Sequence, residues 1–314
     1  MQFYKKRDLG TFISDTFNFF KFYGKNYFKN YILINGLLLI LIVVIGILGF
    51  KDIFGQILNQ NPTEQSVFFQ QYFDDNLGVF IAMIIIMFFL YTFLMLVNYL
   101  FPVFYLKRTA EGNLDIKTDE ILGDFRKNSG KILKLYLGMT FLVIPATIVL
   151  MIISYLLCIV PILFTAPALF NVTMFLSYDY FNGKQGFFES LSYGARAQFS
   201  YSNGREKSPF WKYWGSTIII GMIYNIITMI FTYIPFIFVY ARLLTSPSNA
   251  EFEQNPFTGT FGIIIFVISG ISVLVSVILM NLMYVNCGLM YYDSRTDFHR
   301  KIELEEIETI GINE

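Results

Sequence analysis

The sequence is poor in charged side chains and in the residue types that many enzymes use for catalysis. Only 15% of its 314 residues are charged, and it contains one histidine and two cysteines. A soluble domain usually carries about 25% charged residues. One histidine and two cysteines cannot form a typical zinc site, so we expect no metal site and no cofactor.

Motifs for catalysis and for phosphate binding are also missing. The chain has no glycine-rich phosphate loop, no H-E-x-x-H, no G-x-S-x-G and no C-x-x-C. Its lone histidine, His299, lies in a polar tail, where a solvated surface residue is the simplest interpretation. The 23 basic residues are balanced by 23 acidic ones, which leaves no excess for phosphates and argues against nucleic acid as a partner. These absences predict a protein that is not an enzyme and has no catalytic residues.

What the chain does contain is long apolar runs. It is 55% hydrophobic and 19% aromatic. A helix needs about 20 apolar residues to cross the hydrocarbon core of a bilayer. The uncharged runs cover 31–50, 76–106, 135–178, 213–241 and 254–292. The third run is long enough for two spans, and Pro161 favours a turn near Cys158–Pro161. We interpret the last run as one span, about 261–291, and therefore predict six.

The distribution of positive charge predicts the orientation. With six spans, 21 of the 23 lysines and arginines fall in the segments 1–30, 107–134, 181–212 and 293–314. Cytoplasmic segments of membrane proteins are enriched in lysine and arginine. Both ends are therefore expected in the cytoplasm, and the expected location is the inner membrane of a bacterium.

Three cytoplasmic segments share one layout, in which an amphipathic stretch and a basic residue beside tyrosine precede a span. The basic residues and tyrosines are Lys29-Asn30-Tyr31, Lys134-Leu135-Tyr136 and Lys212-Tyr213. We predict an all-α integral membrane protein, with six transmembrane helices in three hairpins, each preceded by an amphipathic interfacial helix. It would be one membrane domain, 1–314, with repeats at about 9–106, 118–180 and 185–292 and a cytoplasmic tail, 293–314. The alternative is that basic, aromatic loops are common to membrane proteins in general.

Polar residues near or inside the spans are the candidate binding residues. Inside the spans these are Asn98, Asn171, Asn225, Asn281 and Asn286. They could form a polar path for a ligand, but we favour hydrogen bonds between helices. At the cytoplasmic face the candidates are Asp179, Glu189, Asp293 and Arg295. No charge lies in the middle of a span, which argues against proton-coupled transport.

Two short stretches resemble a known group of families. They are DYFNGKQGFFESL, residues 179–191, and Tyr291-Tyr292-Asp293-Ser294-Arg295. They are similar to bacterial multi-span proteins grouped with the membrane domain of glycerophosphodiester phosphodiesterases and with YciC-like uncharacterised proteins. The resemblance implies the hairpin layout. It does not imply phosphodiesterase activity, because that activity resides in a separate soluble barrel for which this chain has no room.

The sequence therefore supports two functional hypotheses. The first is a non-enzymatic bacterial inner-membrane protein that binds membrane lipids or acts as a subunit or scaffold beside another membrane protein. The second is a transporter or channel for a small or amphipathic solute, with the asparagines lining its path.

Overall fold

A computed structural model describes residues 1–57, 62–157, 160–183, 185–199, 208–245 and 259–297. Throughout these ranges the regular structure is helical and contains no strand, so the all-α prediction is confirmed. The turn predicted at Cys158 and most of the tail, including His299, lie outside the described residues.

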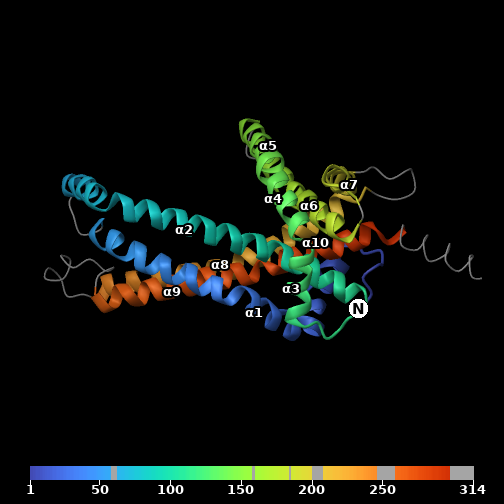
Figure 1. Ribbon diagram of the computed structural model, residues 1–314, viewed down its shortest axis with the longest axis horizontal. Helices are drawn as coiled ribbons and strands as arrows, with labels where there is room; N and C mark the ends of the chain where they lie inside the picture. Colours follow the sequence, from blue (N-terminus) through green and yellow to red (C-terminus); the bar gives the residue numbers. More distant parts are fainter. Residues whose placement is uncertain (58–61, 158–159, 184, 200–207, 246–258, 298–314) are drawn as a thin grey trace, which may run out of the picture. The chain divides into compact units, whose positions relative to one another are not determined.

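Ten α-helices are described along the chain (Figure 1). They are α1 (Leu9–Ile57), α2 (Pro62–Ala110), α3 (Thr118–Lys127), α4 (Ser129–Gly138), α5 (Ile144–Leu156), α6 (Val160–Asn182), α7 (Phe187–Phe199), α8 (Phe210–Thr245), α9 (Gly259–Leu279) and α10 (Asn281–Ser294). A π-helical segment, Met139–Val143, joins α4 to α5.

The described residues include six helical segments that are long and apolar enough to cross a membrane, as predicted. They are Leu9–Leu48, Asn76–Ala110, Ser129–Leu156, Pro161–Asn182, Phe210–Ala241 and Gly262–Ser294. The short helices α3 and α7 precede the second and third pairs of spans. The first amphipathic stretch differs from this pattern, because it forms the beginning of α1 and is not a separate helix. No proline interrupts the chain between Leu9 and Ile57, so nothing forces the helix to end there.

The π-helical segment has a local cause in the sequence. Pro145 lies in the first turn of α5 and has no N–H to donate. The N–H of the preceding residue, Ile144, bonds to the carbonyl of Met139, five residues back. This i→i+5 bond widens the helix by one residue at the proline. Pro145 therefore marks an irregularity between two helical segments.

The chain packs as two compact units, which we describe separately. Unit 1 consists of Met1–Ile34, Tyr99–Ile223 and Asn281–Glu314, and unit 2 of Asn35–Asn98 and Tyr224–Met280. The helices α1, α2 and α8 contribute residues to both units.

The core of unit 1 is formed by α10 and by the second half of α6. Residues 174–181 of α6 and 284–293 of α10 are all buried. A helix that is buried over so many consecutive residues is covered on every side. Helix α7 packs closely on α6 at Gly194, where an added Cβ atom would lie 2.7 Å from the carbonyl oxygen of Val172. Aromatic rings join the first two spans, since Tyr27 and Tyr31 both contact Phe101 of α2.

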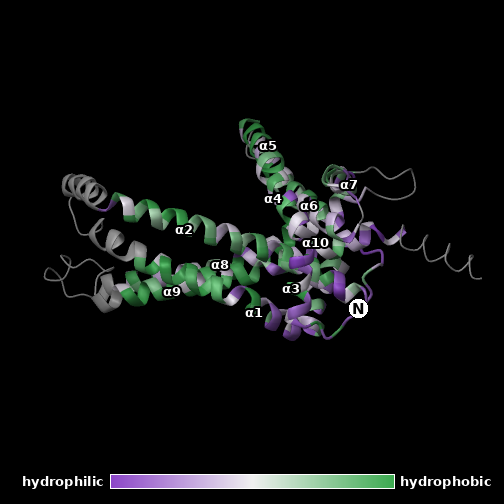
Figure 2. Cartoon of the chain, in the orientation of Figure 1, coloured by the Kyte–Doolittle hydropathy of each residue, from purple (hydrophilic) through white to green (hydrophobic). Residues whose placement is uncertain are grey.

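Unit 2 is a bundle of segments from α1, α2, α8 and α9. Close contacts occur at two glycines, Gly46 beside Met87 and Gly270 beside Val43. Small residues at helix contacts are typical of membrane proteins, where van der Waals packing holds the helices together. In Figure 2 the described residues of these segments are mainly hydrophobic, whereas hydrophilic residues gather in unit 1 around α3 and the beginning of α1.

Gly194→Ala is expected to destabilise the protein, because the new methyl group would collide with the backbone of α6. Overpacking of this kind costs about 1–3 kcal/mol. The measurement is the thermal unfolding midpoint in detergent. Gly130→Ala in α4 is the matched control, since its Cβ atom would meet nothing within 4 Å. Equal midpoints for the two variants would show that the α6–α7 contact is looser than described.

Candidate functional site: a buried charge cluster

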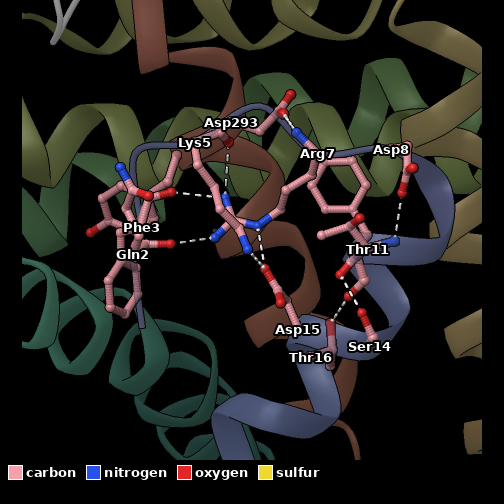
Figure 3. Close-up of polar contacts among 12 residues, drawn as sticks. Gln2, Phe3, Lys5, Arg7, Asp8, Thr11, Ser14, Asp15, Thr16 and Asp293 are labelled. Atoms are coloured by element: carbon pink, nitrogen blue, oxygen red, sulfur yellow. Dashed lines mark hydrogen bonds and ion pairs between the residues drawn. The ribbon is translucent and has the colours of Figure 1, made fainter.

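The segment that precedes α1 is folded around the side chain of Arg7 (Figure 3). The Arg7 guanidinium is fully buried and donates hydrogen bonds to the carbonyl oxygens of Gln2, Phe3 and Lys5, at 2.7, 2.7 and 3.2 Å. An arginine offers five N–H donors in a fixed planar arrangement, which suits several carbonyls at once. We call residues 2–8 the N-terminal strap.

Asp15, in the second turn of α1, neutralises the positive charges of this strap. Its Oδ2 atom lies 2.9 Å from Nε of Arg7 and 2.7 Å from Nζ of Lys5. Burial lowers the pKa of the Arg7 guanidinium, while the hydrogen bond to Asp15 and the charges of Asp15 and Asp293 act in the opposite direction. The guanidinium thus keeps its charge in a buried place because carboxylates lie beside it.

Asp293, near the end of α10, connects the strap to α8. Its Oδ1 atom accepts a hydrogen bond from the backbone N–H of Arg7, at 2.6 Å. Its Oδ2 atom accepts bonds from Nζ of Lys212 and from the hydroxyl of Tyr213, both at 2.6 Å. Lys212 also donates to the carbonyl oxygen of Arg7, at 3.2 Å. One buried carboxylate therefore holds three segments that are far apart in the sequence.

A second buried carboxylate, Asp179, lies near the end of α6. It forms an ion pair with Arg295, which follows α10 directly. The Arg295 guanidinium carbon lies 3.8 Å from the ring centroid of Tyr193 in α7, a cation–π contact. Burial raises the pKa of Tyr193 to about 12. The pair thus joins α6, α7 and the end of α10.

Two lysines cover the carboxyl end of α6. Lys107 of α2 donates to the carbonyl oxygen of Phe181 at 3.0 Å, and Lys131 of α4 approaches that of Tyr180 at 3.5 Å. The last carbonyls of a helix lack partners within the helix and carry partial negative charge. Both lysines are therefore placed where positive charge stabilises the helix.

Arg108 fixes the short helix α3. Its Nε and Nη2 atoms donate to the two carboxylate oxygens of Asp124, at 2.6 and 3.0 Å. Such a bidentate pair fixes direction as well as distance. Asn30 of α1 adds a bond from the Thr118 hydroxyl, at 2.6 Å. The second predicted amphipathic helix is thereby attached to both α1 and α2.

Three of the predicted asparagines bond to other helices inside unit 1. Asn171 of α6 donates to Gln198 of α7 and accepts from Thr217 of α8, at 3.1 and 2.7 Å. Asn286 of α10 donates to the hydroxyl of Ser216 at 2.8 Å. Asn281, at the start of α10, accepts a hydrogen bond from the hydroxyl of Tyr27 of α1, at 2.6 Å. These contacts have the geometry of the interhelical hydrogen bonds that we favoured.

The other sequence candidates differ in exposure. Asn98 is buried in unit 2, and Asn225 is exposed in the same unit. Glu189 is exposed and accepts a hydrogen bond from the N–H of Gly186 at 3.1 Å, so it caps the start of α7. The structure therefore brings Asp179 together with Arg295, and gives Asp293 partners that sequence reasoning did not propose: Arg7, Lys212 and Tyr213.

The described residues of each unit include a hollow. The first, of about 780 Å³, lies in unit 1 between the N-terminal strap and the end of α2. The second, of about 370 Å³, lies in unit 2 between α2, α8 and α9. Neither is lined by any of the five asparagines, so these hollows give no support to a solute path along them.

The charged groups of this cluster bond to one another and hold segments of the chain together. Asp293 accepts bonds on both oxygens, and the charged groups of Arg7 and Lys212 are engaged by it or by Asp15 and backbone carbonyls. A buried pair of this kind is costly to break, because removal of one partner leaves an uncompensated charge. Within the described ranges, no three histidine, cysteine, aspartate or glutamate side chains gather as metal ligands would.

Asp293→Asn is expected to destabilise the protein strongly, since Lys212 and Tyr213 would lose a charged acceptor. Breaking a buried ion pair costs about 3–5 kcal/mol. The matched control is Asp297→Asn, because the Asp297 side chain is 75% exposed in its pair with Lys6 whereas that of Asp293 is 1% exposed. An exposed pair contributes about 0–1 kcal/mol. Thermal unfolding in detergent distinguishes the two, and similar losses would contradict the role of Asp293.

Residues 188–313 match the model of a family described as a protein of unknown function, DUF4013. The match covers α7 to α10 and the residues that follow, which is less than half of the chain. No curated protein and no solved structure matches the chain. These findings agree with an uncharacterised multi-span family, and they give no support to the resemblance to glycerophosphodiester phosphodiesterase membrane domains or to YciC-like proteins. The chain is thus similar, over the four helices α7 to α10, to proteins of unknown function.

Proposed function

We propose that this chain is a non-enzymatic protein of the bacterial inner membrane that binds anionic phospholipids at the cytoplasmic ends of its spans. Its termini lie in the cytoplasm. The observation that carries the proposal is a change from exposed lysines to exposed aliphatic side chains along the outward face of α1.

Three lysines, Lys21, Lys25 and Lys29, are exposed on α1 at intervals of four residues. Residues with this spacing lie on one face of a helix. The exposed residues that follow on the same side are aliphatic, beginning with Ile32 and Leu33. The outward face therefore changes from ammonium groups to hydrocarbon within one helical turn. This is the pattern expected where a helix passes from lipid headgroups into acyl chains.

Helix α4 shows the same change. Lys134 is exposed, and the exposed residues that follow it are Leu137 and Phe141. Helix α7 adds two exposed phenylalanines, Phe188 and Phe199, together with the exposed Arg196. Aromatic and basic side chains on one short helix favour a position in the headgroup region. In α1, α4 and α7, exposed basic side chains thus lie near exposed apolar ones, and this combination suits contact with an anionic lipid surface.

The interior of unit 1 supports a role without catalysis. The buried charges of Arg7 and Asp293 are engaged in the contacts that join the strap, α8 and α10, and neither residue lines the two hollows described above. The exposed lysines of α1 and α4 are suited to electrostatic contact with anionic lipids. A second membrane protein that binds the same surface is the competing explanation, and mild-detergent purification would reveal it as a stoichiometric partner.

The orientation is tested by fusing a reporter that is active only in the periplasm. Fusion after Glu314 should give no activity, and insertion between Gln60 and Asn61 should give high activity. The reason is that 21 of the 23 lysines and arginines fall on the side assigned to the cytoplasm. The reverse result at either position would contradict the topology.

The lipid proposal is tested by replacing Lys21, Lys25 and Lys29 with glutamine. Each lysine near an anionic surface contributes about 1 kcal/mol, so the affinity for phosphatidylglycerol should fall by about 100-fold. The measurement is a titration of short-chain phosphatidylglycerol into protein held in an uncharged detergent. The affinity for phosphatidylcholine should not change.

The matched control replaces the same lysines with arginine, which keeps the charge. It should bind phosphatidylglycerol as the original chain does. Binding to the original chain should also weaken at about 1 M salt, where the screening length is about 3 Å. Unchanged phosphatidylglycerol binding by the glutamine variant, with a normal unfolding midpoint, would refute the proposal.

A further inference from the structure

The beginning of α6 is held against the beginning of α8. The indole Nε1 of Trp214 donates a hydrogen bond to the carbonyl oxygen of Leu163, at 2.9 Å. The ring of Phe164 stacks on that of Trp214, with centroids 5.2 Å apart and an interplanar angle of 14°. Phe164 also meets Trp211 edge-on, at 6.2 Å. The two tryptophans of the chain therefore both lie beside the first turns of α6.

A proline explains why this carbonyl can accept an outside donor. Pro167 lies inside α6 and cannot donate to the carbonyl of Leu163, four residues back. In an apolar environment a backbone carbonyl that loses its helical partner needs another donor. The indole of Trp214 has one N–H and no acceptor, and it supplies that donor. The contact between the two helices is therefore coupled to the irregularity of α6 at Pro167.

This contact limits how far the connection between α5 and α6 can lie from the cytoplasmic charge cluster. Val160, the first residue of α6, precedes Leu163 by a helical rise of about 4.5 Å. Lys212 precedes Trp214 by about 3 Å along α8, and it is paired with Asp293 in the cluster. The connection is therefore within about three helical turns, about 16 Å, of the cluster. The hydrocarbon core of a bilayer is about 30 Å thick.

The other end of α6 is held at the same side of unit 1. Asp179 forms its ion pair with Arg295, which lies two residues beyond Asp293. About 24 Å of helix separates Leu163 from Asp179. A helix that crosses the bilayer has one end at each surface. Both ends of this segment instead contact residues at the cytoplasmic ends of α8 and α10.

Helix α5 runs beside α6 and is apolar over most of its circumference. The Thr165 hydroxyl donates to the sulfur of Met151, at 3.8 Å. At 100° per residue, the exposed apolar side chains cover about 240° of the helix. A single partner helix would cover one face only, so this wide surface suits surrounding hydrocarbon. The exposed residues are Phe141, Leu142, Ile144, Ile148, Val149, Leu150, Ile152, Ile153, Tyr155 and Leu156.

We propose that α5 and the first turns of α6 form a re-entrant hairpin, which enters the cytoplasmic leaflet of the membrane and returns to the cytoplasmic side. Length and hydropathy allow the segments Ser129–Leu156 and Pro161–Asn182 to cross, but the contacts of Leu163 keep their connection near the side from which they start. The segments before and after the hairpin, 107–134 and 181–212, stay in the cytoplasm, so the distribution of lysines and arginines is unchanged. The inference rests on the cytoplasmic orientation proposed above.

The first test determines which side of the membrane the hairpin faces. Cys158 lies between α5 and α6 in the sequence, and the other cysteine, Cys287, is buried. A Gly-Ser pair inserted on each side of Cys158 brings its thiol to water. A membrane-impermeant maleimide is then applied to sealed spheroplasts and to inverted membrane vesicles that contain the full-length protein. Cys158 should be labelled in the inverted vesicles and not in the spheroplasts.

Two control thiols mark the two sides, each in a Cys158→Ser background. Leu114→Cys, at an exposed position of the segment 107–134, should be labelled only in inverted vesicles, and Asn61→Cys only in spheroplasts. If the two controls exchange sides, the proposed orientation is wrong, and the hairpin is still judged by which control Cys158 follows. Labelling of Cys158 together with Asn61→Cys would overturn the hairpin, as would failure to label it from the side of Leu114→Cys.

The second test asks whether the contact persists in a bilayer, and it needs no insertion. A nitroxide is attached to Cys158 of the original chain in liposomes. Because Trp211 and Trp214 are the only tryptophans, their emission reports the distance to the nitroxide. The emission should fall several-fold, whereas a nitroxide on Asn61→Cys in the Cys158→Ser background should leave it unchanged. Undiminished emission with the label on Cys158 would overturn the proposal.

Discussion

The carboxylate of Asp293 is the contact on which the arrangement of unit 1 depends. It receives the backbone of Arg7, the ammonium of Lys212 and the hydroxyl of Tyr213. The strap in turn is folded around the Arg7 guanidinium, whose charge is balanced by Asp15. Buried charges tolerate little displacement, because each must remain paired to offset the loss of hydration. The position of the strap, the start of α8 and the end of α10 are consequently set together.

Much of the fold follows from rules that operate locally. Uncharged runs of about 20 residues are diagnostic of spans, and the structure has six such helices. The irregularity at Pro145 also follows from its missing N–H. The extent of α1 was not predicted, because the amphipathic stretch was assumed to form a separate helix. A helix continues through such a change of polarity when no proline or capping residue ends it.

The site was less predictable because its partners are distant in sequence. Asp179, Asp293 and Arg295 stood out as charges at the ends of spans. Arg7 did not, since in Lys5-Lys6-Arg7 it has the composition of a solvated basic segment. Its guanidinium bonds to residues within eight positions, whereas its backbone N–H bonds to Asp293, 286 positions away. The role of the asparagines was easier to predict, because an amide inside a span needs a hydrogen-bond partner. Asn171 and Asn286 have theirs on neighbouring helices.

The link between Arg7 and Asp293 also has a consequence for biogenesis. The two residues are separated by 286 positions, so the strap emerges from the ribosome long before the carboxylate that fixes it. Until then the strap remains without this acceptor, as does Lys212 once it has been made, and the early spans form before the strap is held in place. Completion of the last helix closes the structure. A chain that stalls before Asp293 therefore leaves the strap and Lys212 without the carboxylate that joins them.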